Sequence, residues 1–162
     1  SKNDQREATK GFVSQLSAHG SDTTAIGFYY KGSSDFYLLC LKPGAREELG
    51  GDLHPALKKL DVLALSRLVF QRIMGISRED LDDERIIEYE SDAGLTLSSV
   101  ITGRTQMAFL LNPTKIEQII EVTGNALLMP RKSTFFHPKI LTGLVFNKID
   151  PHDIIQIPES KG

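Results

Sequence analysis

Apolar residues recur along this chain at two different spacings, and these spacings predict both helices and strands. A first helix is expected from Asp4 to His19, and the clearest helix begins at Asp61 and ends at Gly75. The stretches 25–30 and 36–42 are instead rich in aromatic and aliphatic residues. A turn sequence with Gly32 separates them, so we expect an antiparallel hairpin.

Strands and helices are predicted to alternate in the second half of the chain. Apolar runs at 85–90, 106–111 and 141–147 predict three strands. Helices that begin at Asp92 and at Asn112-Pro113 are expected between them. The sequence therefore predicts an α/β fold of the mixed α+β kind, with a mixed sheet. In it, an N-terminal antiparallel hairpin is followed by strand-helix-strand-helix-strand crossovers.

The length of the chain indicates one folded unit. A chain of 162 residues suits a single domain with its own core, and we expect a single α/β domain at 1–150 and a C-terminal tail at 151–162. The chain begins at Ser1 without a methionine. We therefore expect it to be an excised part of a longer protein.

Composition excludes several classes of function. A net charge of −2 lacks the cationic field of a general nucleic-acid binder, so no nucleic-acid partner is expected. No apolar run approaches the ~20 residues that span a bilayer, so no membrane partner is expected either. Cys40 is the only cysteine and is predicted to be a small buried residue of a strand. The absence of an intrachain disulfide favours a cytoplasmic location.

The segment 129–139 carries the densest candidate chemistry of the chain. Pro130 and Pro138 restrict the backbone between them, which favours a preorganised loop. Guanidinium, ammonium, imidazole and hydroxyl groups together suit a phosphate or carboxylate ligand. The candidate anion-binding residues are Arg131, Lys132, Ser133, Thr134, His137 and Lys139. The alternative is a surface loop whose cations are solvated and whose two phenylalanines pack on the core.

Other constellations are less specific. The acidic run 80–84 is typical of a solvated loop, and the four histidines have no metal-ligand spacing, so no metal site is assigned. The chain contains neither a Gly-x-x-x-x-Gly-Lys phosphate loop nor a Gly-x-Ser-x-Gly nucleophile elbow. No catalytic residue is assigned, and the cofactor and the oligomeric state stay open.

The motif Met-Pro-Arg-Lys-Ser-Thr-Phe-Phe-His-Pro-Lys at 129–139, followed by Thr-Gly-Leu-Val at 142–145, resembles the family called domain of unknown function 1015. The usual family motif is Met-Pro-Gln-Lys-Ser-Thr-Tyr-Phe-Tyr-Pro-Lys, so the chain departs from it at Arg131, Phe135 and His137. Arg131 keeps an anion-binding role, whereas His137 puts a fixed role for that position in doubt. Family members are more than twice as long and carry an upstream Ala-Asp-Gly-His-His-Arg-Tyr signature, which is absent here.

The resemblance implies that the chain is the C-terminal part of a longer protein, and that its site is shared with the N-terminal part. The upstream signature is similar to a Gly-His-His-Arg sequence of free-serine kinases, which implies a small-molecule kinase acting on a nucleotide or phosphorylated small molecule. The isolated chain is then expected to be inactive. The alternative hypothesis is a non-catalytic scaffold or interaction domain, whose loop docks on the partner domain or a second subunit.

Overall fold

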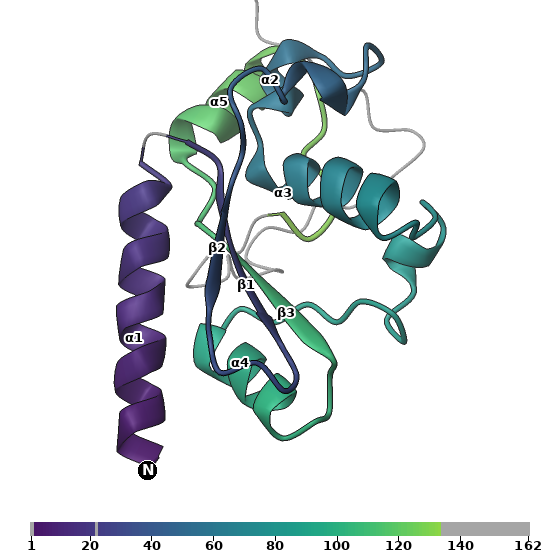
Figure 1. The fold of residues 1–162 in the computed structure, drawn as a ribbon. Helices are drawn as coiled ribbons and strands as arrows, with labels where there is room; N and C mark the ends of the chain where they lie inside the picture. Colours follow the sequence, from purple (N-terminus) through teal and green to yellow (C-terminus); the bar gives the residue numbers. More distant parts are fainter. Residues whose placement is uncertain (1, 22, 134–162) are drawn as a thin grey trace, which may run out of the picture.

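The computed structural model of this protein describes residues 2–21 and 23–133 (Figure 1). Helices and strands are interspersed along this part of the chain, and short 3₁₀ turns join several of them. The main elements are α1 (Lys2–His19), β1 (Ala25–Tyr30), β2 (Tyr37–Cys40), α2 (Pro55–Lys58), α3 (Asp61–Ala64), the π-helix η2 (Leu65–Ile73), α4 (Ala93–Ile101), β3 (Met107–Leu111) and α5 (Ile116–Gly124). The 3₁₀ turns are η1 (Glu47–Leu49) and η3 (Asp80–Asp82).

The three described strands form one antiparallel sheet in the order β2-β1-β3. The predicted hairpin is confirmed, because β1 pairs with β2 from Ala25 opposite Cys40 to Phe28 opposite Tyr37. The strand predicted at 106–111 is also confirmed as β3, which pairs with β1 in the antiparallel sense. The chain therefore has the predicted mixed α+β class. Its described sheet contains no parallel crossover.

The prediction of a strand at 85–90 is wrong. The structure places a turn there, in which the backbone N–H groups of Ile86 and Ile87 donate to the carbonyl of Asp83 at 2.9 and 3.0 Å. The Asp83 carboxylate also accepts from the backbone N–H of Arg85. These local bonds satisfy the backbone groups that a sheet would otherwise use. The strand predicted at 141–147 and the tail at 151–162 lie outside the described residues.

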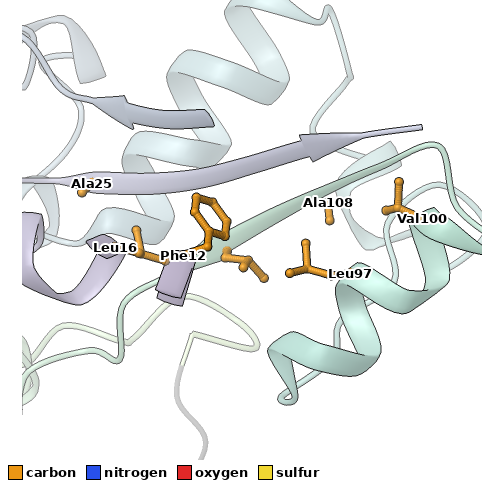
Figure 2. Packing of buried hydrophobic residues seen from close by; sticks show 7 residues of the cluster. Phe12, Leu16, Ala25, Leu97, Val100 and Ala108 are labelled. Atoms are coloured by element: carbon orange, nitrogen blue, oxygen red, sulfur yellow. The ribbon is translucent and has the colours of Figure 1, made fainter. Parts of the chain in front are cut away.

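One face of the sheet is covered by α1 and α4 (Figures 1 and 2). Buried side chains from both helices meet those of β1 and β3 in one core. The members of this core are Phe12, Leu16, Ala25, Leu97, Val100, Ala108 and Leu110. A Cβ atom on Gly27 of β1 would lie 2.8 Å from Phe12 Cζ, so glycine permits the close approach of α1 to the sheet.

A second core lies where α2, α3 and α5 meet. Its buried members are Ala56, Leu60 and Val122, and the side chain of Met129 packs against them. This contact fixes the start of the candidate loop. The helix predicted from Asp61 to Gly75 is present as α3 continued by η2.

Of the two helix starts predicted in the second half of the chain, one is confirmed and one is wrong. Asp92 is the N-cap of α4, as predicted, and its side chain accepts from the backbone N–H of Leu95 at 2.8 Å. The helix predicted to start at Asn112-Pro113 instead has Lys115 as its N-cap. The Asn112 amide is used elsewhere, since it donates to the carbonyl of Leu16 at 3.1 Å.

Cys40 is exposed, which contradicts its predicted burial. The residue is the last of β2, an edge strand of only four residues in which Leu38 alone is partly covered. Its position at the end of an edge strand leaves the thiol beyond the side chains of the core.

Among the described helices, none is long and apolar enough to cross a membrane.

Candidate functional site

The described part of the candidate loop is a tight turn from Pro130 to Ser133. Ser133 bonds twice to the carbonyl of Pro130, through its backbone N–H at 3.3 Å and its hydroxyl at 2.6 Å. The hydroxyl of Thr114 donates to the carbonyl of Ser133 at 2.9 Å, which ties the turn to the segment after β3. These bonds hold the backbone that carries Arg131 and Lys132.

Lys132 occupies the left-handed region of backbone conformation, with φ of 56°. A residue with a Cβ atom costs about 1–2 kcal/mol there, so the surrounding contacts must hold it. Its side chain supplies such contacts. The ammonium group lies 2.9 Å from Glu84 Oε1 and 4.6 Å from the ring centroid of Tyr89.

The acidic run 80–84 meets this turn. Arg131 Nη1 lies 2.8 Å from Asp82 Oδ1, beside the pair between Lys132 and Glu84. The hydrogen bond from Lys132, its positive charge and the charge of Arg131 hold the pKa of the Glu84 carboxyl below its ordinary value of 4.5. The structure thus brings together two oppositely charged segments that are far apart in the sequence.

This cluster is open to solvent. The side chain of Arg131 is 73% exposed and that of Glu84 is 79% exposed, whereas that of Lys132 is 38% exposed. Exposed pairs of this kind contribute little to stability, so their carboxylates can be exchanged for another anion at small cost. Chemically, the turn can hold an oxyanion between a guanidinium and an ammonium group.

The six predicted anion-binding residues fall into two groups. The structure describes Arg131, Lys132 and Ser133 and places them on one turn, but the hydroxyl of Ser133 is committed to Pro130. Thr134, His137 and Lys139 lie outside the described residues. Two surface depressions in the described part lie elsewhere, one along α1 and one beside Arg46.

Sequence reasoning missed the partners of the loop. Asp82 and Glu84 belong to the acidic run 80–84, which is typical of a solvated loop, and Tyr89 falls within the strand predicted at 85–90. Their opposite charge to Arg131 and Lys132 was the available signal, but it does not specify which acidic segment approaches which basic one. Among the described residues, no group of three or more His, Cys, Asp or Glu is placed to hold a metal ion.

A second polar cluster joins the hairpin to α3, and it was also missed. Thr24 is 2% exposed, and its hydroxyl donates to Asp61 Oδ1 at 2.6 Å. Arg46 donates both to Thr24 Oγ1 and to the carbonyl of Lys58, the latter at 2.6 Å. Burial raises the pKa of Asp61, although Thr24 and Arg46 oppose that shift. Each polar group here has a protein partner, so we assign the cluster to folding.

Comparisons of this chain with models of protein families, with curated proteins and with solved structures gave no match. The geometry of the turn 130–133 and of the acidic run 80–84 is therefore what bears on function. The family suggested by the motif at 129–139 stays a prediction.

Proposed function

We propose that loop 129–139 binds an anionic group, such as a phosphate, and that Asp82 and Glu84 compete with this ligand for Arg131 and Lys132. The observation that supports the proposal is that both cations already contact carboxylate oxygens, at 2.8 and 2.9 Å. Oxygens of a bound phosphate would lie at similar distances from the same nitrogens.

Backbone geometry adds support. The turn is closed by bonds to Pro130 and Thr114, so the backbone that carries Arg131 and Lys132 is already held when the ligand is absent. A site that is organised before binding loses less conformational entropy when its ligand arrives. The left-handed conformation of Lys132 also belongs to the kind of local strain that is concentrated at binding sites.

The wider role rests on the family resemblance. On that basis, the chain is the C-terminal domain of a longer cytoplasmic protein, and its loop completes a site shared with the N-terminal part. The whole protein is then a small-molecule kinase of the free-serine type, with a nucleotide or phosphorylated small molecule as ligand. The loop would supply positive charge to a phosphoryl group, which is the main electrostatic need of phosphoryl transfer.

Removal of one loop cation tests the proposal. Lys132→Ala should weaken binding of pyrophosphate to the complete protein roughly tenfold or more, since a charged hydrogen bond is lost. Lys59→Ala is the matched control, because Lys59 also forms an exposed pair, with Glu121 at 2.6 Å, but at another place. Isothermal titration calorimetry measures both affinities. Equal affinity of Lys132→Ala and the unmodified protein would contradict the proposal.

A second candidate function is a scaffold or interaction domain, and the same ion pairs favour it. Lys132 and Glu84 are 48 positions apart in the sequence, so their contact fastens the loop to the body of the domain. In this case the cations serve folding and the loop docks on a partner domain or subunit. Phe135→Ala would then weaken assembly, whereas Lys132→Ala would leave anion affinity unchanged.

A further inference from the structure

Strand β3 lies at the edge of the described sheet but has the sequence of an interior strand. All five residues from Met107 to Leu111 are apolar. Ala108 and Leu110 are buried against α1 and α4 on one side, and Phe109 packs on the other side of the sheet. Edge strands normally carry charges, prolines or bulges, and β3 has none of these. Within residues 2–21 and 23–133, no strand pairs with its outer edge.

The register shows which backbone groups face that outer edge. The N–H of Lys31 donates to the carbonyl of Gln106 at 2.8 Å, so these opposite residues form a hydrogen-bonded pair. Hydrogen-bonded pairs alternate along an antiparallel ladder, so Ala108 and Leu110 also bond to β1. The backbone groups that point away from β1 are those of Met107, Phe109 and Leu111.

The sheet face opposite α1 and α4 is apolar and only partly covered. Phe28 stacks on Phe109 with ring centroids 4.9 Å apart, and Phe70 of η2 meets Phe109 edge-on at 5.2 Å. Elsewhere this face carries apolar side chains that are more than one third exposed. These are Tyr30, Tyr37, Leu39 and Met107. A contiguous exposed apolar surface of this kind marks a place where another segment docks.

The described chain ends near the residues that follow β3. Thr114 follows Leu111 by three residues, and its hydroxyl donates to the carbonyl of Ser133 at 2.9 Å. The apolar run 141–146 comes soon afterwards and contains no charged residue. The intervening seven residues can span up to about 25 Å, whereas a five-residue strand is about 17 Å long. The run is therefore within reach of β3.

We propose that residues 141–146 form a fourth strand on the outer edge of β3. This pairing gives partners to the outward N–H and C=O groups of Met107, Phe109 and Leu111. It also converts β3 into an interior strand, which its sequence favours. One alternate set of side chains of the new strand extends the exposed aromatic face. Neither the run 141–146 nor β3 contains a charged residue, so the pairing buries no charge.

Amide hydrogen exchange of the whole 162-residue chain tests this pairing. The outward amides of Phe109 and Leu111 should exchange at least about a hundredfold more slowly than unstructured amides, because paired amides exchange only on opening. Proline cannot donate to a ladder, and of two successive residues only one N–H faces a given neighbour. One of the variants Leu144→Pro and Val145→Pro should therefore remove the protection of Phe109 and Leu111.

Internal controls keep the test decisive. The amides of Ala108 and Leu110 bond to β1, so their continued protection in the proline variants shows that the sheet is intact. Ser160→Pro, in the tail, should change none of these rates. Rapid exchange of Phe109 and Leu111 in the unmodified chain would overturn the pairing, and so would insensitivity to both proline variants. Protection that rises with protein concentration would assign the edge to a second copy instead.

Discussion

At the scale of residues, the cluster of Thr24, Arg46 and Asp61 shows how one buried side chain can join three segments. Thr24 precedes β1, Arg46 precedes η1, and Asp61 opens α3. The hydroxyl of Thr24 both donates to Asp61 and accepts from Arg46. A serine or threonine hydroxyl is well suited to this position, because it can act as donor and acceptor at once.

Replacing Asp61 by alanine is expected to destabilise the fold. The change leaves the buried hydroxyl of Thr24 without its acceptor and removes the carboxylate that lies 3.7 Å from Arg46 Nη2, so we expect a loss of about 1–3 kcal/mol in the free energy of unfolding. Asp52→Ala is the control, since its carboxylate also pairs with an arginine, Arg67, but lies on the surface. Urea denaturation measures both variants. Equal stability of the two variants would contradict a structural role for the Asp61 carboxylate.

The Glu84 carboxyl is expected to titrate below the ordinary glutamate pKa of 4.5, because Lys132 donates to it. The folded pKa is the lower one, so this contact favours folding above pH 4.5 and is lost as the pH falls through the folded value. Carbon NMR of the side chain measures the midpoint. Lys132→Met should raise the midpoint and Lys59→Met should not. If Lys132→Met leaves the titration midpoint of Glu84 unchanged, the contact is absent in solution.

At the scale of elements, apolar periodicity predicted the helices and strands that form because one of their faces packs on a core. The hairpin, β3, α4 and the helix from Asp61 were all visible in the pattern, because each places apolar side chains on a core. The pattern failed at 85–90, where hydrogen bonds to Asp83 outweigh aliphatic composition. It also failed at Asn112-Pro113, where a distant partner, Leu16, takes the side chain that was expected to cap the helix.

Two leucines of α4 should differ strongly in their contribution to stability. Leu97 is 1% exposed and Leu95 is 59% exposed on the same helix. Leu97→Ala opens a cavity in the core of Figure 2 and should cost about 2–5 kcal/mol in the free energy of unfolding. Leu95→Ala should stay within about 0.5 kcal/mol. Thermal or urea unfolding compares them, and similar losses would show that the packing of α4 is wrong.

At the scale of the whole molecule, the candidate site depends on segments that are distant in the sequence. The basic motif at 129–139 could be recognised from the sequence, because its cations are adjacent. Its carboxylate partners could not, because the contact between Lys132 and Glu84 arises only when the second core has positioned Met129. Charge alone leaves many equivalent pairings, and only the fold selects one.

The most direct test of the proposed site removes the competing carboxylates. Asp82→Asn combined with Glu84→Gln frees Arg131 and Lys132 without removing a cation, so pyrophosphate should bind roughly two- to tenfold more tightly. Asp83→Asn is the matched control, because Asp83 pairs with Arg85 instead. Calorimetric titration of the three proteins gives the answer. We predict tighter binding in the double variant alone; unchanged or weaker binding there would contradict competition between these carboxylates and an anionic ligand.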